Sequence, residues 1–300
     1  MMSYSRRGFL RRAGAVTAAI PAGGLLGSAG LVDHLGASET GTGQDAIPLG
    51  LVTYNWGRDW DLPTVIANCE KTGFAGVELR STHKHGVEPD LTKSQRHEVA
   101  RRFSDSPVEL VGLGTACEYH AEDPAVVKKN IEESQAFIQL CHDLGGGGIK
   151  VRPNRLLKDV PVEKTLEQIG QALRQVAAYG DGYGVAIRLE VHGHGTQELP
   201  HIKTILDVAD HPNLFVCWNC NPQDLKGEGF DTNFDLVADQ IGTVHIHDLR
   251  SNNYPWKKLV KKLNASHFSG WALLEEGKSP DDIVQAMHEN RTIWQQLNSS

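Results

Sequence analysis

Four apolar runs of the sequence each end in a side chain that could bind a metal ion: Glu190, Asn219, His245 and Glu275. Three of these are carboxylate or imidazole groups, and burying such a group without a partner is costly. A divalent cation shared between them would remove that cost. A mixture of carboxylate, amide and imidazole ligands suits Mn²⁺, Mg²⁺ or Co²⁺ better than a structural zinc ion.

The elements that must bring these residues together are predicted to be strands of one parallel sheet. Short β-branched runs alternate with longer amphipathic stretches, which is typical of βα units. Eight such pairs in about 250 residues predict a single (β/α)₈ TIM barrel, since a doubly wound sheet usually stops at five or six strands. The expected strands are Pro48–Tyr54, Gly76–Leu79, Glu109–Gly114, Gly148–Arg152, Val185–Val191, Leu214–Trp218, Thr243–His247 and Trp271–Glu275. The helices are expected near Leu62–Lys71, Lys93–Ser104, Pro124–Leu144, Val162–Tyr179, Leu199–Ala209, Asn233–Gln240, Tyr254–Leu263 and Pro280–Leu297.

The active site of such a barrel is built from the carboxyl ends of its strands. The four candidate ligands end strands five to eight, which are neighbours, so we expect them to form one metal site. Other polar or aromatic residues near strand ends are candidate substrate contacts. These are Glu78, Lys150, Arg152, His192, His247 and Trp218, with Tyr54 and Trp56 as further aromatic faces.

The N-terminal segment has the composition of an export signal. Arg6 and Arg7 precede a mildly apolar run, Ala13 to Val32, which is rich in Ala and Gly and contains Pro21. Such a run is a poor membrane-spanning helix, and the pattern resembles a twin-arginine (Tat) signal peptide. We therefore expect a signal at residues 1–38, a linker at 39–45 and the barrel at 46–300. The mature protein would be periplasmic or otherwise extracytoplasmic, without a stable membrane span.

Composition excludes some classes of function. The formal net charge of −7 argues against a nucleic-acid-binding surface, which requires clustered Lys and Arg. Cys217 and Cys220 form a Cys-x-x-Cys pair, but no second pair follows at the spacing of a zinc finger. The pair also lies at a strand end, whereas redox pairs begin a long helix.

Four short motifs follow one another along the chain: Gly73-Phe74-Ala75-Gly76-Val77-Glu78-Leu79, Leu189-Glu190-Val191-His192, Val244-His245-Ile246-His247-Asp248 and Gly270-Trp271-Ala272-Leu273-Leu274-Glu275. In this order and spacing they resemble the xylose-isomerase-like sugar phosphate isomerase/epimerase family. The resemblance covers nearly the whole chain beyond the signal. It implies that Glu190, the Asn219 position, His245 and Glu275 hold a divalent metal, with Mn²⁺ favoured and Mg²⁺, Co²⁺ or Zn²⁺ compatible. It also implies that Glu190 and Glu275 are the catalytic proton carriers.

Asn219 departs from the family pattern, which usually has Asp at this position. An amide oxygen can still bind a metal, but the site loses one negative charge and metal affinity should fall. Asp224, five residues further on, could compensate from the following loop.

The resemblance implies a metal-dependent isomerase or epimerase that acts on a sugar or keto-sugar by proton abstraction next to a carbonyl. Two alternatives stay open: a keto-glycoside or cyclitol lyase or dehydratase that uses the same site, and a non-catalytic carbohydrate-binding barrel. The AP endonucleases share this fold, but their three zinc ions need more ligands and a basic face for DNA. The expected partner is therefore a small carbohydrate, and the sequence leaves homo-oligomer formation open.

Overall fold

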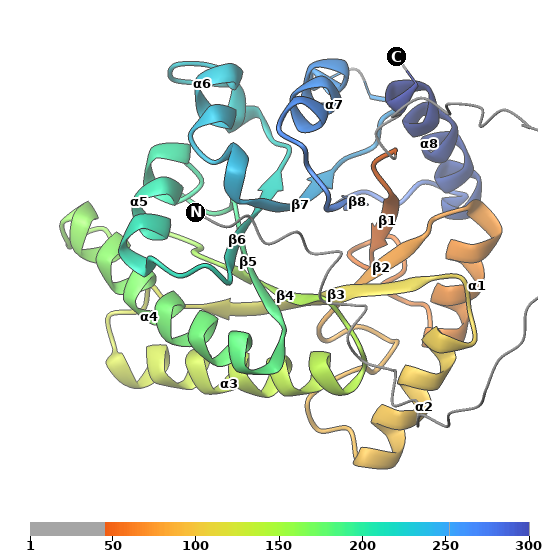
Figure 1. Ribbon diagram of the computed structural model, residues 1–300, viewed down its shortest axis with the longest axis horizontal. Helices are drawn as coiled ribbons and strands as arrows, with labels where there is room; N and C mark the ends of the chain where they lie inside the picture. The colour runs from red at the N-terminus through yellow and green to blue at the C-terminus, as the bar shows by residue number, and fades with distance from the viewer. Residues whose placement is uncertain (1–45, 252, 300) are drawn as a thin grey trace, which may run out of the picture. The chain divides into compact units, whose positions relative to one another are not determined.

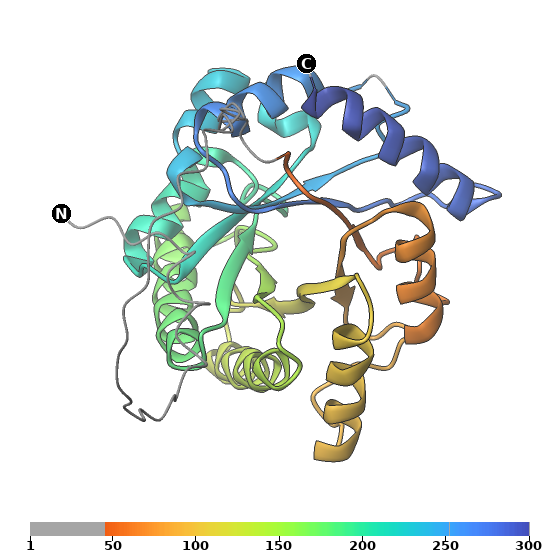
Figure 2. The ribbon, with the colours of Figure 1, turned by 45° about the vertical axis from the view of Figure 1, so that its right-hand side comes forward.

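Eight parallel strands close into a barrel in the order of the chain, and α-helices surround it (Figure 1). This computed structural model describes residues 46–251 and 253–299, and the predicted (β/α)₈ architecture is confirmed. Figure 2 shows the helices forming an outer layer around the strands. The predicted signal peptide at 1–38 and linker at 39–45 lie outside the described residues. Within those residues, every helix is too short or too polar to span a bilayer.

The strands begin close to their predicted positions. In order they are β1 (Leu49–Val52), β2 (Gly76–Arg80), β3 (Glu109–Glu118), β4 (Gly148–Arg152), β5 (Ala186–Glu190), β6 (Leu214–Asn219), β7 (Ile241–Ile246) and β8 (Trp271–Leu274). The main difference is β3, which continues past the predicted end at Gly114. A register shift against β4 lets Glu118 pair with Arg152, so the strand extends to that residue.

The helices also agree with the amphipathic stretches, and their ends have ordinary caps. Asp61, Thr92, Asp123 and Asp282 each accept a hydrogen bond from a backbone N–H of the first helical turn. The helices are α1 (Leu62–Thr72), α2 (Lys93–Ser104), α3 (Pro124–Asp143), α4 (Val162–Tyr183), α5 (Leu199–Ala209), α6 (Phe230–Asp235), α7 (Trp256–Ala265) and α8 (Ile283–Asn298).

Two helical predictions are corrected by the structure. α4 was expected to end at Tyr179 but continues to Tyr183, and it ends where Gly184 adopts a left-handed conformation (φ 67°). The single helix expected at Asn233–Gln240 is instead α6 followed by a short 3₁₀ turn, Ala238–Gln240. The backbone at Val237 (φ −130°, ψ 3°) is not helical and separates the two.

Strand alternation divides the buried residues between two faces of the barrel wall. One set packs outward against the helices, and the other set faces the barrel interior. The interior contains a small apolar cluster of Val52, Val111 and Leu273, with Tyr54 and Trp271 packed against it. The ends of β5 to β8 add charged and polar side chains to the same interior.

Candidate metal centre and active site

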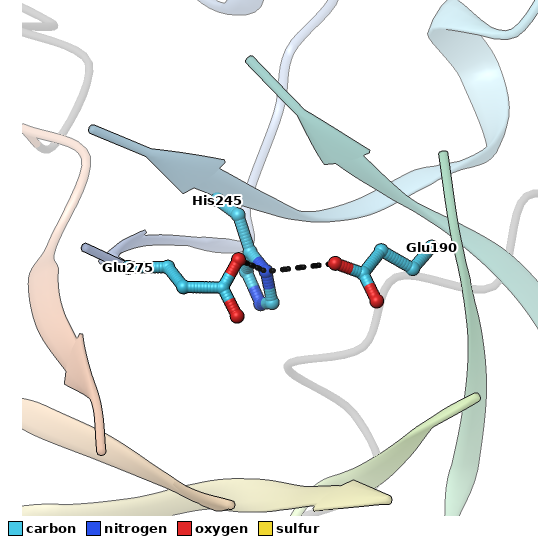
Figure 3. Close-up of side chains that lie close together, drawn as sticks. All are labelled: Glu190, His245 and Glu275. Carbon is cyan, nitrogen blue, oxygen red and sulfur yellow. Dashed lines mark hydrogen bonds and ion pairs between the residues drawn. The ribbon is translucent and has the colours of Figure 1, made fainter. Parts of the chain in front are cut away.

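Glu190, His245 and Glu275 form a compact cluster inside the barrel, at the carboxyl ends of β5, β7 and β8. One ligand atom from each residue lies within 4.8 Å of the other two. Nδ1 of His245 is 3.2 Å from Oε2 of Glu275 and 3.8 Å from Oε1 of Glu190. Figure 3 shows the two carboxylates approaching the imidazole from opposite sides. Three of the four predicted ligands are thus brought together.

Asn219, the fourth predicted ligand, ends β6 and lies beside the cluster. Its Nδ2 donates a 2.9 Å hydrogen bond to Oε1 of Glu190. Its Oδ1 is buried and has no hydrogen-bond partner within the described residues. A buried oxygen without a donor is costly, and a cation would satisfy it. The donor set of two carboxylates, one imidazole and one amide oxygen therefore fits a divalent metal ion.

Glu78 of β2 lies on the other side of the imidazole. Its carboxylate is fully buried, and Oε1 is 3.4 Å from Nε2 of His245. Burial by itself would raise the pKa of Glu78, but His245 and Lys150 lower it below its usual value. This arrangement leaves Nδ1 of His245 facing the two cluster carboxylates and Nε2 facing Glu78. Metal-binding histidines commonly direct their second nitrogen to a carboxylate in this way.

Lys150 of β4 contacts the cluster directly. Its Nζ donates to Oε2 of Glu190 at 2.8 Å, and both side chains are only 3% exposed. Burial alone would lower the pKa of Lys150, but Glu190, Glu275 and Glu78 raise it. Burial has the opposite effect on a carboxylate and would raise the pKa of Glu190, but Lys150 and His245 hold this pKa well below its usual range. The pair is therefore ionised, and Lys150 stabilises a charged Glu190.

The pKa of His245 is also set by burial and by neighbouring charges that oppose each other. Burial lowers its pKa, but Cys217, Glu275 and Glu78 together raise it well above the ordinary value. Without a metal, the imidazole is therefore a cation among carboxylates. A metal ion would replace its proton, because a ligating imidazole must be neutral.

Two interior residues were missed in the sequence analysis. Arg188 of β5 is buried and donates to the carbonyl of Val111 at 3.0 Å. Its side chain occupies space left by two glycines, since a Cβ at Gly112 or Gly148 would lie 2.8 or 2.9 Å from guanidinium nitrogens. Cys217 of β6 is the other. Each lies two residues before a predicted ligand, so strand alternation alone could have identified both.

Three further predicted site residues surround the cluster in different ways. His247 donates from Nδ1 to the backbone carbonyl of Glu275 at 2.7 Å, so it holds the chain at that residue. Arg152 forms an ion pair with Glu118, the residue that ends the unexpectedly long β3. His192 follows Glu190 by two residues, and its buried Nδ1 has no hydrogen-bond partner in the described chain.

Trp218 does not line the site. It alternates with Cys217 and Asn219 along β6, so it faces the helices, where it is fully buried against Phe230 and Phe234. The expectation that Trp218 contacts the substrate is therefore not met. Trp56 is also buried, with its indole N–H bonded to the carbonyl of Lys278.

Asp224 does not compensate for the missing ligand charge. It is buried behind β6, where Oδ2 accepts hydrogen bonds from the Tyr254 hydroxyl at 2.8 Å and the Asn221 backbone at 2.9 Å. Burial raises the pKa of Asp224 to about 7, and these hydrogen bonds only partly oppose it. It belongs to the outer cluster that contains Trp218, because Tyr254 also accepts from the indole of Trp218.

The fold and the cluster together define a class: a (β/α)₈ barrel with a carboxylate and imidazole centre at the carboxyl ends of its strands. The sequence profile of the family described as "Xylose isomerase-like TIM barrel" matches residues 66–296, and the chain belongs to this family.

Similar proteins include several sugar epimerases. The chain is 23% identical over 257 residues to an L-ribulose 3-epimerase from Methylomonas sp. (strain DH-1), covering 81% of this chain and 88% of that protein. The structure of a 3-keto-D-glucoside 4-epimerase from E. coli superimposes with a TM-score of 0.71 at 12% identity, covering 83% of this chain and 99% of that one. An IolI protein with a bound zinc atom superimposes with a TM-score of 0.68 at 16% identity, covering 84% and 96%.

Proposed function

We propose that this protein is a divalent-metal-dependent epimerase or isomerase of a keto-sugar, which moves a proton on the carbon next to the carbonyl. The observation that carries the proposal is the cluster of Glu190, His245 and Glu275, in which two carboxylates approach from opposite sides. The epimerase names of the similar proteins support the same reaction class.

Glu190, Asn219, His245 and Glu275 would hold the metal, and Mn²⁺ is the cation we propose. A bound metal would supply a Lewis acid for the carbonyl and the adjacent hydroxyl of the sugar. The zinc atom of the IolI protein makes Zn²⁺ an alternative to test alongside Mn²⁺, Mg²⁺ and Co²⁺.

The proton chemistry falls to the two carboxylates. A carboxylate on each side of the reacting carbon lets one residue remove a proton while the other returns it to the opposite face. Lys150 keeps Glu190 ionised and therefore able to accept a proton. His192, Arg152 and the other polar residues around the cluster are proposed contacts for sugar hydroxyls.

We also propose that the protein is exported by the Tat pathway, on the basis of Arg6 and Arg7 and the apolar run that follows. Tat export moves folded proteins, so a metal could be loaded before export. An exported enzyme meets free or oxidised sugars more often than sugar phosphates. Fusing residues 1–38 to a reporter that is active only after export would test this proposal.

A screen in D₂O tests the proposed reaction. Keto-sugars and 3-keto-glycosides are incubated with the protein and Mn²⁺, and each carbon is followed by NMR. We expect deuterium at the carbon next to the carbonyl and a second epimer or isomer, both lost when EDTA is added. Loss of a leaving group instead of epimerisation would indicate the lyase alternative. Absence of exchange with every ketose tested would contradict the proposal.

Two features of the cluster favour a second candidate function, a barrel that binds carbohydrate without a metal ion. Lys150 already neutralises Glu190, and Asn219 removes the charge that an aspartate would add. Metal analysis separates the two candidates. Protein purified without chelator should contain about one divalent ion per chain if the enzyme proposal is correct, and no bound metal if the second candidate is correct.

Asn219→Asp is expected to tighten Mn²⁺ binding about tenfold, since an extra carboxylate adds a charged ligand. The same change should lower the free energy of unfolding of the metal-free protein, because it replaces the hydrogen-bond donor to Glu190 with a second negative charge. Calorimetric titration with Mn²⁺ measures the first effect, and Asn219→Ala serves as the matched loss-of-ligand control. Equal Mn²⁺ affinity in all three proteins would mean that Asn219 is not a ligand.

Glu78→Gln is expected to weaken Mn²⁺ binding by about ten- to a hundredfold, because the second nitrogen of His245 loses its carboxylate. Titration of the purified variant checks this, with Glu70→Gln on the exposed side of α1 as the control for a simple loss of charge. Unchanged affinity in Glu78→Gln would show that Glu78 does not orient the histidine.

A further inference from the structure

A positively charged pocket lies between the loops that follow β1 and β2, at the same end of the barrel as the proposed active site. It has a volume of about 400 Å³, and Thr82 forms part of its wall. Three cations and one histidine also line it, together with a single carboxylate: Arg58, Arg80, Lys84, His83 and Asp59. The proposed reaction uses none of these residues.

The positive charge of the pocket is only partly compensated, by Asp59 in its wall and by Asp61 and Glu88, on which the charges of Lys84 and Arg80 act. Within the described residues, none of the three cations forms an ion pair. Arg58 and Lys84 are exposed, whereas Arg80 is half-buried with its guanidinium 5.8 Å from the ring centroid of Tyr54. The formal balance of the lining side chains is +2, from three cations and Asp59, in a protein whose net charge is −7. A local excess of this sign attracts anions.

The electrostatics of His83 agree with this excess. Burial lowers the pKa of His83, and its hydrogen bond to the Thr53 carbonyl opposes that effect. The neighbouring Arg80 and Arg58 then lower the pKa further. The imidazole is therefore neutral at pH 7, and its Nδ1 donates to Thr53.

The pocket is built before any ligand arrives, because backbone contacts join its two loops. The amide of Lys84 donates to the carbonyl of Arg58 at 3.0 Å. The amide of Arg80 donates to the hydroxyl of Thr53 at 2.9 Å, and His83 bonds to the carbonyl of the same threonine. A preformed site loses little conformational entropy when it binds a ligand.

The pocket is also connected to the proposed reaction centre through β2. Arg80 lies two residues beyond Glu78 on the same strand, so both side chains face the barrel interior. The two positions are roughly 7 Å apart along the strand. One substituted sugar could therefore extend from the metal ligands to the guanidinium of Arg80.

We propose that this pocket binds an anionic substituent of the substrate, a carboxylate, sulfate or phosphate group carried by the sugar. The inference rests on the proposed function, since it assigns the charge of that same substrate. Arg58 and Arg80 present planar guanidinium groups that match these anions, and Lys84 adds a point charge. Uronates, sugar sulfates and sugar phosphates share this chemistry, and the experiment separates them.

Calorimetric titration of the full chain at low salt tests the inference with four probes. These are D-glucuronate, D-glucose 6-sulfate, D-glucose 6-phosphate and neutral D-glucose. At least one charged probe is expected to bind about tenfold more tightly than D-glucose, by one charge-assisted contact. The tightest probe identifies the source of the anion. Equal affinity for all four probes would overturn the inference.

Three variants locate the binding in this pocket. The double variant Arg58→Gln/Lys84→Gln should lose the preference for the charged probe and keep its affinity for D-glucose. Asp59→Asn should tighten binding of the charged probe about threefold, which a misfolded protein would not do. Lys129→Gln, an exposed lysine on α3, is the matched control and should change nothing. A charged-probe preference that survives the double variant would place the anion elsewhere and overturn the inference.

These measurements are independent of turnover. Charge-dependent binding without deuterium exchange on any ketose would support the anion pocket and contradict the proposed reaction. Epimerisation of neutral keto-sugars without any preference for a charged probe would support the proposed reaction and contradict the anion pocket.

Discussion

Epimerisation is expected to fall about a thousandfold when either Glu190 or Glu275 is replaced by glutamine, because an amide cannot accept the proton that the carboxylate removes. The two residues approach His245 from opposite sides, so neither should substitute for the other. The measurement is the conversion of an active keto-sugar in D₂O, followed by NMR with Mn²⁺ at saturating concentration.

Both residues are also proposed metal ligands, so loss of metal could mimic loss of a base. Metal content must therefore be measured in each variant under the assay conditions, and rates compared only for loaded protein. Glu132→Gln, on the exposed surface of α3, is the control for the loss of one carboxylate. Full epimerisation by a loaded Glu190→Gln or Glu275→Gln protein would contradict the assigned roles.

Lys150→Met is expected to destabilise the metal-free protein by about 3–5 kcal/mol, because the buried Glu190 carboxylate loses its partner. The reason is burial: both side chains of the pair are 3% exposed, so water cannot replace the lost ammonium. Mn²⁺ should restore part of this stability, by about 2.7 kcal/mol at a hundred times its dissociation constant. Urea unfolding with EDTA and then with Mn²⁺ measures both effects.

The surface provides a matched comparison for this variant. Lys164 and Glu167 on α4 form an ion pair with the same 2.8 Å separation, but their side chains are 68% and 43% exposed. Lys164→Met should therefore change the free energy of unfolding by less than about 1 kcal/mol. If Lys150→Met is no more destabilising than Lys164→Met, the buried pair does not have the electrostatic role described above.

Strand alternation explains where the structure places the predicted site residues. Glu190, Asn219 and His245 end apolar runs, and the barrel brings their side chains to its interior as expected. Trp218 is predicted as a substrate contact because it is an aromatic residue at a strand end, although it adjoins Asn219 along the strand and therefore faces the opposite side. The same rule would have placed Arg188 and Cys217 inside the barrel.

Other features depend on contacts that no local pattern specifies. β3 extends to Glu118 because a register shift lets it pair with Arg152, and register is a property of two strands. Asp224 lies close to Asn219 in sequence, yet the turn after β6 directs it to Tyr254 and away from the ligands. The cationic pocket combines residues of two loops whose backbones are hydrogen-bonded to each other.

The sequence by itself determined the barrel and which three side chains, Glu190, His245 and Glu275, cluster inside it, because the periodicity of eight strand and helix pairs is local information. The substitution of Asn219 for an acidic ligand was also visible there. Only the tertiary structure decided how the charges are distributed: Lys150 pairs with Glu190, Glu78 faces His245, and Arg58, Arg80 and Lys84 line one pocket whose single carboxylate is Asp59. The physical reason is that strand periodicity specifies the face on which a side chain lies, whereas closure of the barrel and its loops brings together charges from distant positions in the chain.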